Sequence, residues 1–397
     1  MSDALAIRLR DEIRAGGPIT FARFMEVALT DPEHGYYTRG ASRPARAGDF
    51  LTAPEMDPVF GLTLARQVDE CWRLLGEPAI FTLREHGAGS GALAVSIVEG
   101  LRADRSGLVV ARSDGPAPLR YEPVEIDGRR REALVPRLAE TAPEVVVGEP
   151  DPGQRMTGFV LANELVDALP VHRVAGRPGG IDEVLVGWDD DPAAPLGGRF
   201  TDVVAEPTTA ALAARLTDEG VVLAEGQPAE VRLADADWTA GVARDLERGY
   251  VLVVDYGAPA ADLYDPARRP AGTLLAYAGH RALGDVYADP GDQDLTAHVD
   301  ATALERAATA SGLDVLGRTT QAAFLLGCGL EEVFGRLRAD PALTPERYLV
   351  LRSAVRRLLD PRLLGGFFVL ALSRGVPPEA RALRGFESVA GGPRTGG

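Results

Sequence analysis

The chain has 397 residues, a formal net charge of −16 and a hydrophobic fraction of 46%. This length suits one large α/β domain with additions, or two domains, and the composition is that of a globular protein with a sizeable core. The acidic charge disfavours nucleic acid and anionic lipid as partners.

Residue usage excludes several chemistries. The chain has no lysine, so it has neither a Walker A lysine nor a lysine for a pyridoxal Schiff base. Two distant cysteines form no disulfide framework, and five scattered histidines predict no metal site. No apolar run approaches the ~20 residues that span a bilayer, and the first residues lack an apolar signal segment. We therefore expect a cytoplasmic protein without membrane insertion.

The N-terminal region, residues 1–76, predicts helices. Apolar residues recur at helical spacing over 5–13, and Thr20 can cap a second helix that ends before Asp31. A third helix is expected over about 55–75, after a flexible loop.

From residue 77 onward, apolar strands alternate with helices, which is typical of a doubly wound parallel sheet. Strands are expected at 79–85, 121–126, 145–147, 158–162, 250–255, 313–316 and 367–372. We predict a Rossmann-like α/β domain over 77–377, with a β-hairpin insertion at about 171–206. The Arg-, Gly- and Pro-rich tail, 378–397, predicts disorder.

A glycine-rich loop follows the first predicted strand and opens a helix. Its pattern is Glu85-x-Gly87-x-Gly89-x-Gly91. Glycine lets the backbone turn sharply and approach a ligand, and the helix N-terminus adds free N–H donors. A dinucleotide fingerprint would place its third glycine one residue later. The spacing instead resembles motif I of methyltransferases that use S-adenosylmethionine (SAM), with an NAD-dependent dehydrogenase as the alternative.

A ribose-binding acid is expected at the tip of the next strand, where Glu122, Glu125 and Asp127 are candidates. We choose Glu125, because a carboxylate there can accept hydrogen bonds from both ribose hydroxyls. The alternative, given equal weight, is that all three are ordinary surface acids.

The only asparagine begins a second motif, Asn163-Glu-Leu-Val-Asp-Ala-Leu-Pro170, at the end of the fourth predicted strand. Ligands bind beyond the carboxyl ends of strands in open α/β sheets. Glu164 and Asp167 are three residues apart, so a helical turn would place both carboxylates on one side, where they suit a guanidinium. In the alternative, Asn163 and Asp167 cap a helix and Glu164 is solvated.

In this order, the motifs resemble the MidA family of SAM-dependent methyltransferases, whose mitochondrial members are protein-arginine methyltransferases needed for respiratory complex I assembly. Further matching segments are 19–25, 31–37, 48–55, 255–257 and 289–299. The resemblance implies a class I methyltransferase fold with an N-terminal helical lid, SAM as cofactor and a protein substrate.

The resemblance also implies residue roles. The residues expected at the cofactor are Asp49, Thr52, Glu85, Gly87, Gly89, Gly91, Glu125 and Asn163. Glu164 is our first candidate for the acceptor side and Asp167 the second, and His298 is a candidate for proton removal. Scattered histidines are more often structural.

Departures from the family pattern leave the substrate open. The link between Tyr37 and Gly48 is longer than usual, and Asp57-Pro58 stands where the family has Ser-Gln. Two rivals to a protein-arginine methyltransferase also remain open: a SAM-binding scaffold without turnover, and a small-molecule methyltransferase. The oligomeric state is also open, a homodimer included.

Overall fold

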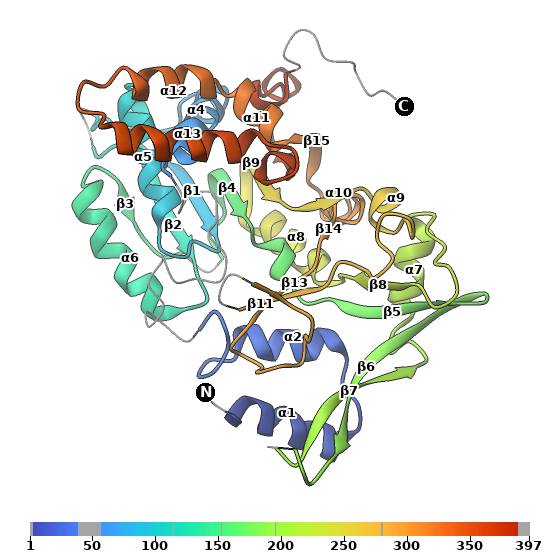
Figure 1. Cartoon of the computed structure of the whole chain (residues 1–397). Helices are drawn as coiled ribbons and strands as arrows, with labels where there is room; N and C mark the ends of the chain where they lie inside the picture. Colours follow the sequence, from blue (N-terminus) through green and yellow to red (C-terminus); the bar gives the residue numbers. More distant parts are fainter. Residues whose placement is uncertain are drawn as a thin grey trace. The chain divides into compact units, whose positions relative to one another are not determined.

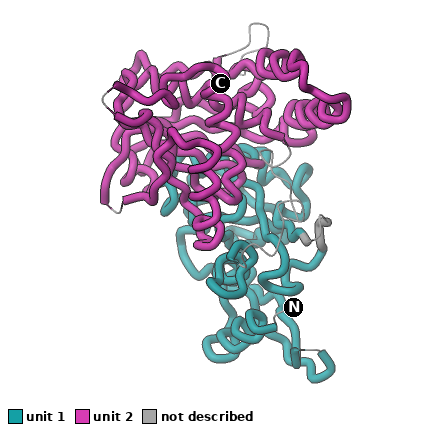
Figure 2. The backbone as a smooth tube through the Cα atoms, turned by 90° about the vertical axis from the view of Figure 1, so that its left-hand side faces the viewer, with its two compact units in different colours: residues 1–50, 166–239, 257–307 teal, residues 51–165, 240–256, 308–397 magenta. Residues whose placement is uncertain are grey.

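The computed structural model describes residues 3–38, 57–113, 115–151, 153–194, 196–278 and 281–387. The chain divides into two compact units that interleave along the sequence (Figure 2). Unit 1 comprises residues 1–50, 166–239 and 257–307, and unit 2 comprises residues 51–165, 240–256 and 308–397. The domain boundaries expected from the sequence stay a prediction.

Unit 2 contains a seven-stranded sheet in the order β15-β16-β9-β4-β1-β2-β3 (Figure 1). Its strands are β1 (Phe81–His86), β2 (Leu119–Val124), β3 (Val146–Val147), β4 (Met156–Asn163), β9 (Leu246–Asp255), β15 (Asp314–Thr320) and β16 (Phe368–Arg374). The first five run parallel, whereas β16 is antiparallel to both β9 and β15. The predicted doubly wound α/β fold is confirmed.

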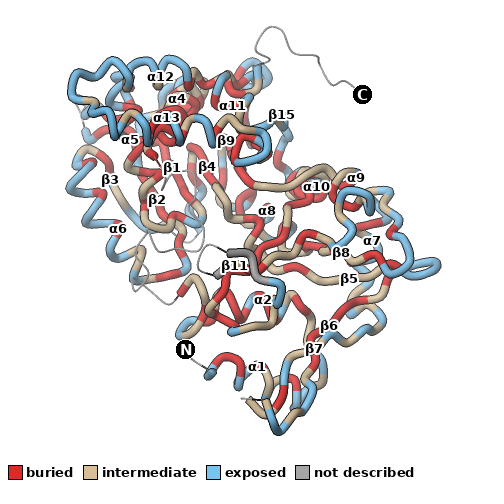
Figure 3. Tube along the Cα trace, in the orientation of Figure 1, coloured by how far each residue is buried: buried red, intermediate tan, exposed pale blue. Residues whose placement is uncertain are grey.

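Helices cover this sheet because its central strands are apolar on both faces. Strands β4 and β9 are buried along almost their whole length (Figure 3), as parallel strands between helical layers must be. The helices of unit 2 are α4 (Val59–Leu74), α5 (Ala92–Ala103), α6 (Gly128–Thr141), α11 (Gln321–Gly327), α12 (Leu330–Arg338) and α13 (Pro345–Leu359). Helices α8 (Ala234–Asp245) and α10 (Ala301–Ala310) run across the unit boundaries. One core joins α4, α5 and α11–α13 to one face of the sheet.

The order of strands locates the ligand-binding edge. Strand β1 pairs with β2 on one side and with β4 on the other, so the strand order reverses at β1. Ligands of open α/β sheets bind beyond the carboxyl ends of the strands at such a point. The residues placed there are the glycine loop after β1, Glu125 after β2 and Asn163 at the end of β4.

Among its described residues, unit 1 contains two antiparallel sheets, a parallel pair of short strands and several helices. Its four-stranded sheet has the order β7-β6-β5-β8, from β5 (His172–Arg177), β6 (Gly180–Asp190), β7 (Gly198–Ala205) and β8 (Pro228–Val231). Strands β5 to β7 form the predicted hairpin insertion. The other elements are α1 (Asp3–Gly16), α2 (Phe21–Thr30), η2 (Val166–Ala168), α7 (Ala210–Asp218), β10 (Gly257–Ala258), α9 (Ala260–Leu263), β11 (Leu275–Ala278), β12 (Arg281–Leu283), β13 (Asp294–Thr296) and β14 (Val299–Asp300). Helices α1 and α2 pack through their apolar faces into a core shared with β6, β11 and β13.

The C-terminal segment differs from the expected disorder as far as it is described. Residues 378–387 form two 3₁₀ turns, η4 (Pro378–Ala380) and η5 (Arg384–Phe386). The Tyr250 hydroxyl donates to the Ala380 carbonyl at 2.7 Å, and Leu383 is buried in the core of unit 2. Residues 388–397 lie outside the described residues. Within the described ranges, the structure has no helix with the length and hydropathy to cross a membrane.

Candidate active site

The glycine loop leaves the end of β1 with three left-handed residues. Gly87, Gly89 and Gly91 have φ angles of +73°, +53° and +73°. The Gly87 amide donates to the Val124 carbonyl at 2.8 Å, which ties the loop to the end of β2. Gly91 is the N-cap of α5, so the helix begins directly after the loop. These positions require glycine for their backbone conformation, as predicted.

The three glycines differ in what a side chain added at each position would meet. A Cβ atom at Gly87 would lie 3.1 Å from Leu165, and one at Gly91 would lie 2.8 Å from Leu134. Among the residues that the structure describes, a Cβ atom at Gly89 would meet only the Gly87 carbonyl, at 3.9 Å. Gly87 and Gly91 therefore admit neighbouring side chains of the protein, whereas Gly89 faces open space before the first turn of α5. A nucleotide cofactor fits that space.

Glu125 follows β2 and is held by backbone donors. Its Oε2 accepts from the Gly89 amide at 2.8 Å, and its Oε1 accepts from the Asp127 amide at 3.0 Å. A carboxylate has about four acceptor positions, so two remain for ligand hydroxyls. The bond to Gly89 also links this acid directly to the glycine loop. This geometry fits the ribose role predicted for Glu125.

Glu85, the acid before the loop, is buried and only 4% exposed. The Tyr121 hydroxyl on β2 donates to its Oε2 at 2.5 Å. Burial raises the pKa of Glu85 to about 8, the Tyr121 hydrogen bond lowers it, and the Glu125 charge raises it further. The carboxyl is therefore largely protonated at neutral pH when no ligand is bound. Sequence reasoning missed Tyr121, although it lies four positions before Glu125 at the start of the expected strand.

Asn163 and Glu164 lie at the carboxyl end of β4. The Glu164 amide donates to the Val254 carbonyl of β9 at 2.8 Å, and the Asn163 side-chain amide donates to a Glu164 carboxylate oxygen at 3.2 Å. Asn163 Oδ1 is buried and accepts no hydrogen bond from the described residues, so it can accept one from a ligand. Glu164 has a φ of +50°, a strained conformation for a non-glycine residue that is frequent at functional sites.

One expectation about this motif is wrong. A single helical turn carrying both Glu164 and Asp167 does not form, because Glu164 adopts the left-handed conformation and the 3₁₀ turn η2 begins only at Val166. Asp167 lies inside that turn, in unit 1, and is 5% exposed. It is therefore not a helix cap.

His298 also lies in unit 1, beside the segment of Asp167. The Ala297 amide donates to the Asp167 carbonyl at 3.1 Å, and the His298 amide donates to Thr273 Oγ1 at 3.2 Å. Burial, together with the charges of Arg269 and Arg232, lowers the pKa of His298 to about 4. Its imidazole is therefore neutral at physiological pH.

Asp49 and Thr52 lie outside the described residues. Asp255, which was not selected as a site residue, is completely buried at the carboxyl end of β9, where its Oδ1 accepts from the Tyr256 amide at 2.8 Å. Its position at the end of a long apolar strand was the sequence feature that could have marked Asp255 as a candidate.

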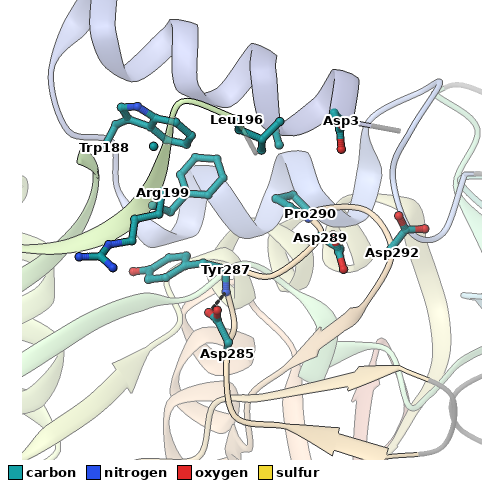
Figure 4. A pocket seen from close by; sticks show the side chains of 12 residues that line it. Asp3, Trp188, Leu196, Arg199, Asp285, Tyr287, Asp289, Pro290 and Asp292 are labelled. Carbon is teal, nitrogen blue, oxygen red and sulfur yellow. Dashed lines mark hydrogen bonds between the residues drawn. The ribbon is translucent and has the colours of Figure 1, made fainter. Parts of the chain in front are cut away.

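A cavity of about 200 Å³ lies in unit 1, and none of the predicted site residues lines it (Figure 4). Trp188, Phe200 and Tyr287 form its aromatic wall, and the Tyr287 amide donates to Asp285 Oδ1 at 2.9 Å. Arg199 lies at the same cavity.

Comparison with known proteins agrees with the arrangement of loop and strand ends. A family model described as S-adenosyl-L-methionine-dependent methyltransferase matches residues 63–319. The chain belongs to this methyltransferase family. It is a SAM-dependent methyltransferase, and the resemblance predicted from the motifs is confirmed.

Individual relatives match this chain over at least nine tenths of its length. The protein arginine methyltransferase NDUFAF7, mitochondrial, of Rattus norvegicus is 31% identical over 90% of this chain and 81% of its own length. The human protein of the same name is 30% identical with the same coverage. A crystal structure from Burkholderia thailandensis bound to S-adenosyl-homocysteine is 34% identical, with a TM-score of 0.81 over 97% of this chain and 95% of that chain.

These relatives contradict the expected cytoplasmic location, because the curated proteins are named as mitochondrial. The expectation rested on the lack of an apolar leader. That argument fails because mitochondrial targeting segments are amphipathic and arginine-rich rather than apolar.

Proposed function

We propose that this methyltransferase transfers the methyl group of SAM to arginine side chains of a protein. The observation that carries the proposal is Glu164, a carboxylate held in a strained backbone conformation at the carboxyl end of β4, beside Asn163. A carboxylate there suits the forked donors of a guanidinium. The curated relatives, named protein arginine methyltransferases, support the same acceptor.

On the cofactor side, we assign binding to the residues at the ends of β1, β2 and β4. Gly89 leaves space beside the first turn of α5, Glu125 offers free acceptor positions to ribose hydroxyls, and Asn163 Oδ1 offers a buried acceptor. Asp49 and Thr52 belong to the N-terminal segment that we expect to cover the cofactor. When bound, SAM supplies a methyl group activated by its positive sulfonium.

On the acceptor side, Glu164 binds and orients the guanidinium, and Asp167 is the second candidate for this role. With SAM bound, its sulfonium would supply the methyl group to the acceptor nitrogen and would leave as the neutral thioether. The acceptor nitrogen then loses a proton. His298 is the candidate to receive this proton, because burial keeps its imidazole neutral at physiological pH. Its pKa of about 4 makes it a weak base, so it would pass the proton on rather than keep it.

The decisive experiment identifies the acceptor. Incubation of the protein with labelled SAM and a lysate of its host, followed by mass spectrometry, should find methylated arginine on a protein. Label in small molecules only would favour the small-molecule methyltransferase. SAM binding without any transfer would favour the scaffold.

Glu164→Gln tests the residue on which the proposal depends. Glutamine keeps the size but loses the charge and one acceptor oxygen. We expect SAM affinity within about threefold of wild type, and single-turnover transfer slowed by about 2–4 kcal/mol of barrier. Glu331→Gln, the same change at an exposed position on α12, is the control and should transfer at the wild-type rate. Normal transfer by Glu164→Gln would remove Glu164 from the mechanism.

A further inference from the structure

Arg232, the residue after β8, is a buried arginine whose guanidinium binds backbone carbonyls within the described ranges. It is 5% exposed, and its Nη2 donates to the carbonyls of Asp167 at 3.1 Å and Ala297 at 2.8 Å. Its Nε donates to Leu169 at 3.2 Å, and its Nη1 makes a longer contact of 3.5 Å to the His298 carbonyl. No ion pair of Arg232 occurs within the described ranges.

These contacts join two distant segments of unit 1. One segment, 167–169, contains Asp167, and the other, 297–298, contains His298. A direct backbone bond joins them, from the Ala297 amide to the Asp167 carbonyl at 3.1 Å. Arg232 adds donors to both sides of that bond, so one planar guanidinium fixes the spacing of the two segments.

Strand β8, which precedes Arg232, also holds the backbone of His298, through Glu230 and Thr273. Glu230, two residues before Arg232, accepts from the Thr273 amide at 2.7 Å and from the Thr273 hydroxyl at 2.8 Å. Thr273 Oγ1 in turn accepts from the His298 amide at 3.2 Å. The backbone of His298 is therefore held at its N–H through Glu230 and Thr273, and at its carbonyl by Arg232.

We propose that Arg232 is a positioning residue for methyl transfer, which holds the backbones of Asp167 and His298 at a fixed spacing. The proposal rests on the proposed function, because that function gives Asp167 and His298 their acceptor-side roles. Neither lysine nor methionine can replace the guanidinium, since lysine offers a single ammonium centre and methionine offers no donor. A misplacement of about 1 Å can slow transfer about 100-fold.

The test compares Arg232→Met and Arg232→Lys with the control Arg269→Met. Arg269 also places positive charge near His298, but its guanidinium makes no hydrogen bond or ion pair in the part of the chain that the structure describes. Rates are measured in single turnover on the acceptor found by labelling, per SAM-binding site counted by calorimetry. That normalisation removes molecules that have lost their fold.

We expect Arg232→Met to slow transfer about 10–100-fold per SAM-binding site, with SAM affinity within about threefold. Arg232→Lys should lie between methionine and wild type, and Arg269→Met should stay within about twofold of wild type. A wild-type rate per site for Arg232→Met would overturn the proposal. An equal loss in Arg269→Met would also overturn it, because charge rather than position would then be responsible.

Two further measurements keep the outcome clear. If both Arg232 variants fail to fold, Thr273→Val is the milder variant: it removes the hydroxyl that holds the His298 amide, and transfer should slow by several-fold. Hydrogen exchange at the Ala297 amide should quicken in Arg232→Met, and unchanged exchange would overturn the proposal without reference to activity. A wild-type protein that methylates no acceptor would overturn the proposed function itself, whatever the exchange shows.

Discussion

Glu85, an acid beside the proposed cofactor loop, shows how burying one carboxyl affects stability. It lies at the end of a central strand, is buried, and receives a hydrogen bond from Tyr121. Burial raises its pKa to about 8, against an ordinary value of 4.5. The free protein therefore retains a proton on Glu85 that the unfolded chain has released at neutral pH. The acid next to the glycine loop is thus sensitive to pH in the physiological range.

This pKa makes a prediction for Glu85→Gln. Between pH 4.5 and about 8 the folded protein binds one proton more than the unfolded chain at this position. The free energy of unfolding therefore falls with rising pH, by at most about 1.4 kcal/mol per unit. Glutamine mimics the protonated acid and removes this dependence. Urea unfolding without ligand should show the variant gaining stability over wild type as the pH rises through this window.

Tyr121→Phe provides the companion variant. The Tyr121 hydroxyl lowers the pKa of Glu85, so its removal should raise that pKa and extend the loss of stability to higher pH. A stability difference between Glu85→Gln and wild type that is the same at every pH would contradict the buried, protonated acid.

At the scale of an element, the glycine loop combines backbone and cofactor requirements. Gly87 and Gly91 admit the side chains of Leu165 and Leu134, whereas Gly89 faces open space. The three positions therefore respond differently to substitution. If Gly89 borders the cofactor as proposed, a side chain there would compete with the cofactor rather than with the described protein atoms.

We expect Gly89→Val to abolish SAM binding while the protein stays folded. Valine would occupy the open space and would also be strained at a φ of +53°. Gly76→Val is the matched control, because Gly76 lies in the same unit with a φ of +82° and no atom within 4 Å of its Cβ position. The control should lose stability, on the order of 1–2 kcal/mol, yet bind SAM in calorimetry. Normal SAM binding by Gly89→Val would place the cofactor elsewhere.

For the whole molecule, the relevant quantity is the net charge of −16. A strongly acidic enzyme attracts a cationic polypeptide over a distance that salt shortens, to about 10 Å at 0.1 M ionic strength. We therefore expect the KM for the protein acceptor to rise several-fold between about 50 and about 300 mM salt. The Kd for SAM should change less, because its contacts are short-range. A KM independent of salt would show that the acidity serves solubility alone.

The sequence by itself determined the doubly wound sheet, the hairpin insertion and the glycine loop after β1. These features depend on local patterns: apolar runs at strand spacing, alternation with helices, and glycine where φ must be positive. The candidates Glu125, Asn163 and Glu164 could be chosen for the same reason, since each follows an apolar strand whose carboxyl end is known once the strand is recognised.

Only the tertiary structure decided how these residues are held. The hydrogen bonds from Tyr121 to Glu85 and from Gly89 to Glu125 each join residues 36 positions apart, and Arg232 binds residues about 65 positions away on either side. The left-handed backbone of Glu164, which prevents the expected helical turn, is fixed by a bond to β9. Periodicity along the chain carries no information about such contacts, because they arise only when distant segments pack together and bury their polar groups.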